Sequence, residues 1–455
     1  MPSVTALPEA GPEKTRGVTR IALASAIGAT IEWYDFFLYG VVAGLVFNKL
    51  FFPSYDPVIG TLLSYTTFAI GFVARPIGGV IFGHYGDRIG RKTILVLTLL
   101  IMGLSTTAIG LLPTYAGVGV AAPLLLLFLR VLQGIGIGGE WGGAVLMAVE
   151  HAPRGRRGFY GSYPQVGVPA GLMLSAAVVA LLGLMPNESF LAWGWRIAFL
   201  LSALLVVVGL FIRLKITETP DFVEVKEAGR AVRAPAVELF RTHSRNVALG
   251  VGARYIEGVC FNMWGVFIIA YATQSLHLAR STALLGVVIA SGLMVPFVLF
   301  YGAIADRIGP RRLYAAGALV LGLLAFPSFW LMRTAGAEHP LLVWLGIIVP
   351  LSFAYPAVYA PQAALFSSLF AANVRYSGIS FCYQFSGIFA SGLTPLIAAA
   401  LLSWGGGEPW YICAYIVLVS LISFACVLAM RAVDSVPAAD AGLATAARQE
   451  ELGRA

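Results

Sequence analysis

Two carboxyl side chains stand inside a long apolar stretch of this sequence, where no water is available to hydrate an ion. Glu32 and Asp35 are three residues apart in the stretch 20–46 and therefore share one face of a helix. Carboxylates this close repel each other when both are ionised, which suits groups that take up and release protons. The simpler alternative is that one of them pairs with an arginine of a neighbouring helix. We expect at least one of the two to carry a proton.

Three arginines are embedded in the same way and indicate an anionic ligand. Arg75 has no acidic residue nearby in its own helix, so its counter-charge must come from another helix or from a bound solute. A planar guanidinium matches a carboxylate with two hydrogen bonds. Arg254 and Glu257 are three residues apart and can instead neutralise each other. With nearby amides and tyrosines, the expected ligand-binding set is Arg75, Arg254, Glu257, Gln165, Gln384, Tyr34 and Tyr383.

The third arginine, Arg130, begins the sequence R-x-x-Q-G together with Gln133 and Gly134. Glu140 lies ten residues further along the same stretch, roughly 15 Å away by helical rise, so the two cannot pair directly. Arg130 can take part in proton coupling, recognise an anion or form a structural salt bridge. Glu140 is a candidate for a proton relay or a gate charge.

The elements that must hold these charges are membrane helices. Of the 455 residues, 59% are hydrophobic and 11% are charged, whereas about 25% of a soluble domain is charged. An apolar helix needs about 20 residues to cross a bilayer. We predict an all-α membrane protein with twelve transmembrane helices, at 20–46, 57–83, 93–112, 121–149, 158–183, 192–212, 246–274, 281–304, 313–332, 340–368, 374–402 and 409–430.

The basic residues predict how these helices are oriented. The net charge is +8, but lysine and arginine gather in alternate loops, among them 88–92, 154–157 and 213–245. Basic residues in short loops mark the cytoplasmic side of a membrane. Both termini are therefore predicted to be cytoplasmic, and the positive charge does not indicate nucleic-acid binding.

A repeat divides the chain into two halves. The pattern Gly-x-x-x-Asp-Arg-Ile-Gly occurs at 83–90 and again at 302–309, and the same offset of 219 residues carries Gln165 onto Gln384. Two such halves around a central ligand site are one way of building a secondary transporter. The predicted organisation is a cytoplasmic segment 1–19, a six-helix half 20–212, a cytoplasmic linker 213–245, a six-helix half 246–431 and a cytoplasmic tail 432–455.

The repeated loop has more than one possible role. Basic residues alone would anchor the helices to lipid, whereas a repeated aspartate among positive charges needs a partner, and the positive N-terminal end of a neighbouring helix can supply it. We expect a cytoplasmic gate that contains Asp87, Arg88, Arg91, Asp306 and Arg307.

The two loops resemble the inter-helix motif of the major facilitator superfamily. Within it, the stretches IGATIEWYDFFLYG (27–40), RVLQGIGIGGEWGG (130–143) and VEHAPRGRRGFYGSYPQVGVPAG (149–171) look like the bacterial metabolite:H⁺ symporters, which include shikimate, 2-oxoglutarate, citrate and proline/betaine carriers. The resemblance implies two pseudo-symmetric halves, a monomer in the inner membrane and a role for Arg130 in proton coupling. The motif is matched by Gly83, Gly86, Asp87, Arg88, Gly90, Arg91 and Lys92, and more weakly by Gly302, Asp306, Arg307, Gly309 and Arg311.

The expected function is proton-coupled import of a small organic acid by alternating access, either shikimate-like or a di- or tricarboxylate such as 2-oxoglutarate. A proline or betaine symporter is the alternative, followed by a membrane sensor and a membrane-embedded enzyme. The five histidines are scattered and no His-Glu metal pattern or activated serine is visible, so we expect no enzyme, cofactor or metal. The residues expected in proton coupling are Glu32, Asp35, Arg130 and Glu140.

One glycine motif, taken alone, would indicate a nucleotide-binding protein and not a transporter. Gly134, Gly136 and Gly139 match the G-x-G-x-x-G spacing of a dinucleotide-binding loop. No strand precedes them, however, and Gly134, Gly138 and Gly142 recur every four residues along one helix face. Small residues at this spacing let helices approach closely in lipid. We therefore predict a helix-packing surface at these glycines.

Overall fold

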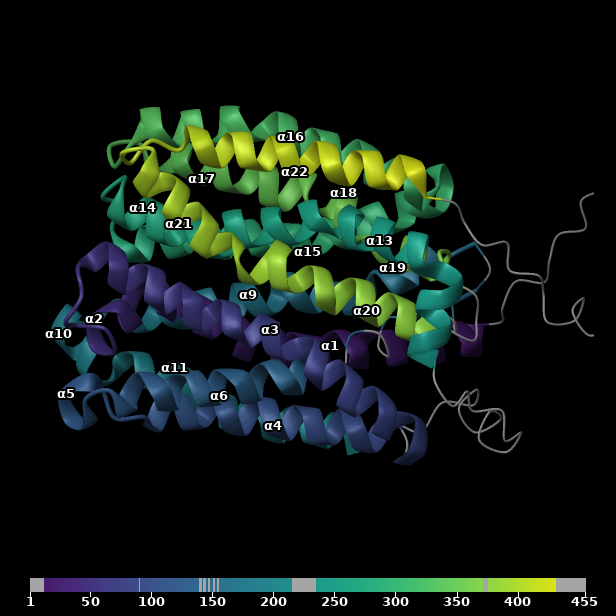
Figure 1. Cartoon of the computed structure of the whole chain (residues 1–455), viewed down its shortest axis with the longest axis horizontal. Coiled ribbons are helices and arrows are strands. Elements are labelled where there is room, and N and C mark those ends of the chain that lie inside the picture. The colour runs from purple at the N-terminus through teal and green to yellow at the C-terminus, as the bar shows by residue number, and fades with distance from the viewer. Residues whose placement is uncertain are drawn as a thin grey trace, which may run out of the picture.

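The chain forms a bundle of long helices in a computed structural model (Figure 1). The structure describes residues 12–430 apart from 90, 139–140, 142–144, 146–147, 150–151, 154, 215–234 and 371–374. At 12–22, 83–89, 91–92, 235–238 and a few single positions it describes the backbone alone. Glu140, the side chains of Asp87, Arg88 and Arg91, most of the predicted linker and the predicted tail thus lie outside the described residues.

The first half contains six long helical segments, several of which include a π-helical turn (η) or a short extra helix. They are α1 (Pro12–Val42) with η1 (Ala43–Phe47) and α2 (Asn48–Leu50), α3 (Pro57–Ile89), α4 (Arg91–Leu111), α5 (Tyr115–Val118) before α6 (Ala121–Gly138), α8 (Arg157–Gly161) with α9 (Tyr163–Leu182), and α10 (Asn187–Ser189) and η2 (Phe190–Gly194) with α11 (Trp195–Leu214).

The second half repeats this plan, including a π-helical turn late in its first helix. Its elements are α13 (Pro235–Asn262) with η3 (Met263–Phe267) and α14 (Ile268–Gln274), α15 (Arg280–Ile308), α16 (Pro310–Ala335), α17 (Pro340–Ile348) with η4 (Val349–Ala354), α18 (Pro356–Tyr359) and α19 (Gln362–Ser367), α20 (Arg375–Gly387) with η5 (Ile388–Gly392) and α21 (Thr394–Trp404), and α22 (Trp410–Ala429).

The helical class predicted from hydropathy is confirmed. Eleven helical segments among the described residues are long and apolar enough to cross a membrane, and the apolar helix Val96–Leu111, which is part of α4, is shorter. The described residues contain no strand. Because α4 packs against α6 and α11, it completes the six-helix plan of the first half.

The two halves lie side by side (Figure 1). Within the first half, α1 packs against α9 and α3 packs against α6, while in the second half α13 packs against α20 and α22. Across the interface, α9 packs against α15 and α3 packs against α20 and α21. We call the end of the bundle where α1 begins and α22 ends the tail end, and the opposite end, with α2, α5, α10 and α14, the far end (Figure 1).

Glycines bring α3 and α6 into direct backbone contact. A Cβ atom added at Gly134 would overlap the carbonyl of Gly71, and one added at Gly138 would overlap the carbonyl of Arg75. From the other side, a Cβ at Gly78 would overlap the carbonyl of Ile135. The predicted packing surface is thus confirmed for Gly134 and Gly138; Gly139, Gly142 and Gly143 lie outside the described residues.

The predicted linker is partly helical. Helix α13 begins at Pro235, inside the segment 213–245, and its backbone leaves helical geometry at His243 (φ −128°, ψ 21°). The kink separates a short leading helix from the membrane-spanning part that carries Arg254 and Glu257.

Candidate functional site

The embedded charges meet in the middle of the bundle and are shielded from solvent. Their exposed fractions are 3% for Glu32, 0% for Asp35, 1% for Arg75, 0% for Arg130 and 2% for Arg254. These residues come from α1, α3, α6 and α13, so four helices from both halves are needed to assemble the site. Burial of this many ionisable groups is costly in a membrane protein and makes this region the candidate functional site.

A chain of polar side chains connects Arg130 to Asp35. Arg130 Nη1 donates to Gln133 Oε1 at 3.1 Å, and Gln133 Nε2 donates to Thr106 Oγ1 at 2.7 Å. Thr106 lies beside the Asp35 carboxyl, whose Oδ1 atom accepts a hydrogen bond from Ser202 Oγ at 2.5 Å. The second oxygen, Oδ2, has no hydrogen-bond partner. The R-x-x-Q-G motif of α6 therefore lies near a carboxyl group of α1, with Thr106 of α4 between them, while the Thr106 hydroxyl itself donates to the Met102 carbonyl at 2.9 Å.

Arg75 has aromatic neighbours in place of a counter-ion. Its guanidinium carbon Cζ lies 4.0 Å from the ring centroid of Phe72, 4.1 Å from that of Phe36 and 5.3 Å from that of Trp33. The Nε and Nη2 atoms have no hydrogen-bond partner, and no ion pair to Arg75 exists among the described residues. Cation–π contacts offset part of the cost of burial, but the donors of a buried guanidinium still require acceptors.

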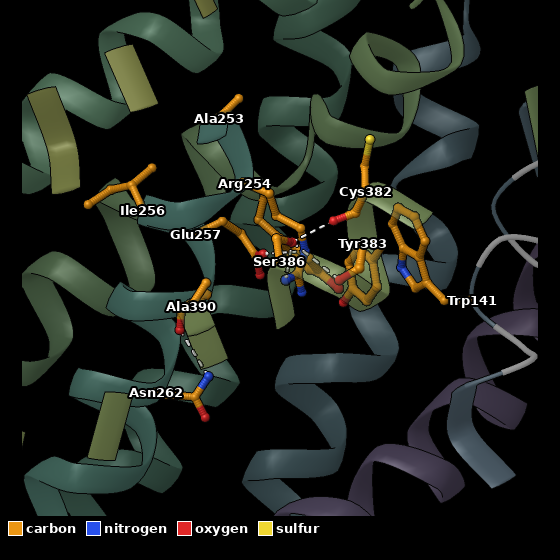
Figure 2. A network of polar contacts seen from close by, with 12 residues as sticks. Trp141, Ala253, Arg254, Ile256, Glu257, Asn262, Cys382, Tyr383, Ser386 and Ala390 are labelled. Carbon is orange, nitrogen blue, oxygen red and sulfur yellow. Dashed lines mark hydrogen bonds and ion pairs between the residues drawn. The ribbon is translucent and has the colours of Figure 1, made fainter. Parts of the chain in front are cut away.

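Arg254, by contrast, has an ion-pair partner in its own helix (Figure 2). Its Nε atom lies 3.2 Å from Glu257 Oε2, and its Nη1 donates to Ser386 Oγ at 3.0 Å. Glu257 also accepts a hydrogen bond from the Tyr355 hydroxyl at 2.7 Å. The mutual neutralisation of Arg254 and Glu257, one of the two possibilities raised by their spacing, is present in this conformation.

An aromatic stack joins this pair to the first half (Figure 2). The guanidinium of Arg254 lies 3.7 Å from the ring centroid of Tyr383, and Trp141 of the first half stacks on the same ring at 3.6 Å with an interplanar angle of 13°. Tyr383 thus belongs to the site. Tyr34 differs, because its hydroxyl donates to the Ala198 carbonyl at 2.7 Å within the first half.

The two equivalent glutamines bridge the halves. Gln165 of α9 donates to the Tyr359 carbonyl at 2.8 Å and accepts a hydrogen bond from Trp141 Nε1 at 3.3 Å. Gln384 of α20 donates to the Gly138 carbonyl at 2.8 Å, while its Oε1 atom has no hydrogen-bond partner. Both amides were expected to bind ligand; in this conformation their donor groups hold the two halves together.

At the tail end, Asp306 contacts the opposite half. Its two carboxylate oxygens accept hydrogen bonds from the backbone N–H groups of Gly158, at 2.7 Å, and Phe159, at 2.9 Å, in the first turn of α8. This is the approach to a helix N-terminus that the repeated loop suggested. Arg307 is exposed. The matching side chains of Asp87, Arg88 and Arg91 lie outside the described residues.

Several residues of the site were not predicted. Gln133 was noticed only as part of R-x-x-Q-G, although its position one turn after Arg130 is a usable signal. Thr106, Ser202 and Ser386 carried no signal, because hydroxyl residues are common in membrane helices and usually bond to their own backbone. Phe36 and Phe72 were indistinguishable from packing residues in the sequence.

Comparison with known proteins identifies the family. Residues 25–392 match the Major Facilitator Superfamily. The chain belongs to this superfamily. It is 39% identical to the shikimate transporter of Escherichia coli, over 94% of this chain and 98% of that one. It is also 34% identical to a glycine betaine/proline/ectoine/pipecolic acid transporter of Dickeya dadantii, over 87% and 79% of the two chains.

The fold also matches that of solved members of the superfamily. The structure of a proton:xylose symporter superimposes with a TM-score of 0.72 at 16% sequence identity, covering 91% of this chain and 95% of that one. At this identity the match concerns the fold. The predicted organisation of the membrane helices as two pseudo-symmetric six-helix halves is thereby confirmed.

Proposed function

We propose that this protein is a proton-coupled symporter that imports a small organic anion across the bacterial inner membrane. The observation that carries the proposal is the buried guanidinium of Arg75, which has unsatisfied donors and no counter-ion among the described residues. A carboxylate bound there would form two charge-assisted hydrogen bonds. The relationship to a shikimate transporter supports a hydroxylated carboxylic acid as the first candidate.

Proton coupling is assigned to the polar chain between Asp35 and Arg130. A fully buried carboxyl group held by Ser202 and placed beside Thr106 can be protonated without creating a buried charge. Loss of that proton creates a negative charge that is stabilised by the positive charge of Arg130 through Gln133 and Thr106. Glu32, which is buried one turn earlier on α1, is the second candidate for the proton site, and Glu140 stays a proposal from sequence.

Alternating access requires the contacts between the halves to open in turn. We infer that the tail end faces the cytoplasm, as the distribution of basic residues predicts. The bonds of Gln165, Gln384 and Asp306 to the opposite half then close the cytoplasmic side. At the far end, Arg280 of the second half donates to Asn187 of the first at 2.5 Å and closes the outer side. The structure therefore corresponds to a state with contacts at both ends.

A betaine or proline symporter is the second candidate, because relatives with that specificity share the fold and aromatic rings surround the site. A quaternary ammonium group needs an aromatic face. Around the site, however, the ring of Trp33 faces Arg75 and that of Tyr383 is stacked between Arg254 and Trp141. Because these aromatic faces are already covered by arginine side chains and by Trp141, the site favours an anion over a cationic headgroup.

Transport by purified protein in liposomes tests both candidates. Labelled shikimate, 2-oxoglutarate, citrate and glycine betaine are offered with an acidic exterior, with and without a proton uncoupler. We expect one of the acids to accumulate unchanged and the uncoupler to abolish its accumulation. Accumulation of betaine alone would favour the second candidate, and accumulation insensitive to the uncoupler would exclude proton coupling.

The Arg75→Lys substitution tests the anchor itself. Lysine keeps the charge but cannot form the two parallel hydrogen bonds, so apparent affinity for the acid should fall about tenfold, as expected when one hydrogen bond between charged groups is lost. Arg333→Lys is the matched control, because Arg333 pairs with Glu408 at the exposed far end. Equal affinity in both variants would remove Arg75 from the binding site.

A further inference from the structure

Phe36 contacts both the proposed substrate anchor, Arg75, and the proposed proton-coupling residue, Arg130. It follows Asp35 on α1 and is completely buried. The guanidinium carbon of Arg75 lies 4.1 Å from its ring centroid, and that of Arg130 lies 4.1 Å from the same centroid. One aromatic ring thus contacts both the unpaired arginine of α3 and the arginine of the polar chain on α6.

The surrounding rings fix this arrangement. Phe72, which lies under Arg75, meets Phe36 edge to face at 4.8 Å and 90°. Phe68, which lies 4.8 Å from Arg130, packs against Phe36 at 5.5 Å and against Phe72 at 5.3 Å. The negative faces of these rings stabilise two positive charges that form no ion pair among the described residues.

Because the two guanidinium groups share one ring, they are close enough to repel each other. An anion on Arg75 removes that repulsion and competes with the ring for the guanidinium of Arg75. Arg130 is then free to settle more closely on Phe36, which changes its hydrogen bond to Gln133. A shift of the α1 backbone at Phe36 would also move Asp35, the residue directly before it.

We propose that Phe36 is a positioning residue that transmits occupancy of Arg75 to Arg130 and Asp35, and so ties substrate binding to proton movement. The proposal rests on the symporter function proposed above. It assigns to the Phe36 ring a role that packing alone does not require. Phe37 provides the contrast, since it is also buried and contacts Trp33, Phe36 and Phe261, but it contacts no guanidinium of the described residues.

The test compares two transport modes in liposomes that contain Phe36→Leu protein. Exchange of labelled for unlabelled acid requires binding and movement of the halves but no net proton transfer, whereas uptake driven by a proton gradient requires coupling. We expect gradient stimulation of uptake to fall about tenfold, the effect of losing a desolvated cation–π contact, while exchange stays within about threefold of wild type. Phe36→Tyr, which keeps the aromatic face, should restore the stimulation.

Two controls separate coupling from general damage. Phe37→Leu removes a neighbouring ring of the same size and should leave gradient stimulation unchanged. Phe36→Met replaces the ring with a flexible side chain of similar length. If the leucine variant is unstable, gradient stimulation of uptake is measured in the methionine variant instead. Unchanged stimulation in Phe36→Leu and Phe36→Met, or an equal loss in Phe37→Leu, would overturn the assignment.

Failure of the broader function has a different signature. A wild-type protein that neither exchanges an organic acid nor responds to the gradient would overturn the symporter proposal and this inference with it. A wild-type protein that does both, with Phe36 variants that behave identically to it, would overturn the role of Phe36 alone.

Discussion

Gln165 and Gln384 occupy equivalent positions in the two halves, and each donates a hydrogen bond to a backbone carbonyl of the opposite half, at 2.8 Å in both cases. The acceptors are Tyr359 in one direction and Gly138 in the other. The two glutamines thus hold the interface between the halves from both sides, each through an amide-to-carbonyl hydrogen bond. The internal repeat therefore produces a symmetric clamp between α9 and α18 and between α20 and α6.

Removal of this clamp should open the tail end. In a Gln165→Leu, Gln384→Leu protein, each lost hydrogen bond should destabilise the closed interface by about 1 kcal/mol. Labelling of a cysteine introduced at the buried Ser162 with an impermeant maleimide, applied from the tail side, should become faster. Gln274→Leu, at the exposed far end, is the control. Identical labelling rates would show that the amides do not hold this end closed.

Asp306 should contribute to the same closure by charge. Asp306→Asn keeps the shape but removes the negative charge from the N-terminus of α8, a loss of about 1 kcal/mol and about fivefold in the ratio of closed to open forms. The same cysteine labelling measures it. Asp56→Asn is the matched control, because Asp56 accepts a hydrogen bond from the Val58 N–H within one half. A larger effect in the control would contradict a role between the halves.

Asp35→Asn should uncouple transport from the proton gradient. The amide can still accept the Ser202 hydrogen bond but cannot release a proton, so gradient-driven accumulation should fall to the level seen with an uncoupler while exchange continues. Glu338→Gln, at an exposed position, should have no effect. If the Asp35 variant still accumulates acid against its gradient, the proton is carried elsewhere, and Glu32→Gln becomes the next variant.

Gly134→Ala should destabilise the first half. The added methyl group would overlap the Gly71 carbonyl and force α3 and α6 apart, at a cost of about 1–3 kcal/mol. Thermal unfolding of the detergent-solubilised protein measures this cost. Gly117→Ala is the control, since a Cβ there meets only Pro113 at an ordinary contact distance of 3.8 Å. Equal melting temperatures for both variants would contradict close packing at Gly134.

The sequence alone specified three features of this protein: the membrane-spanning helices, their arrangement in two repeated halves and the presence of embedded charges. Hydropathy is a local property of the sequence. A charged residue within an apolar stretch can therefore be recognised without knowledge of the tertiary structure. The Arg254–Glu257 pair could be anticipated for the same reason, because residues three apart on a helix are neighbours in any fold.

The partners of the other charges were decided by the tertiary structure. Arg130 lies near Asp35 only because α4 places Thr106 between them. Arg75 and Arg130 share the ring of Phe36 only because α1, α3 and α6 pack together with these side chains turned toward one another. Likewise, Gln165 and Gln384 find carbonyl groups that no local pattern specifies. Helix rotation and crossing depend on the packing of many side chains at once, so contacts between helices become fixed when the bundle assembles.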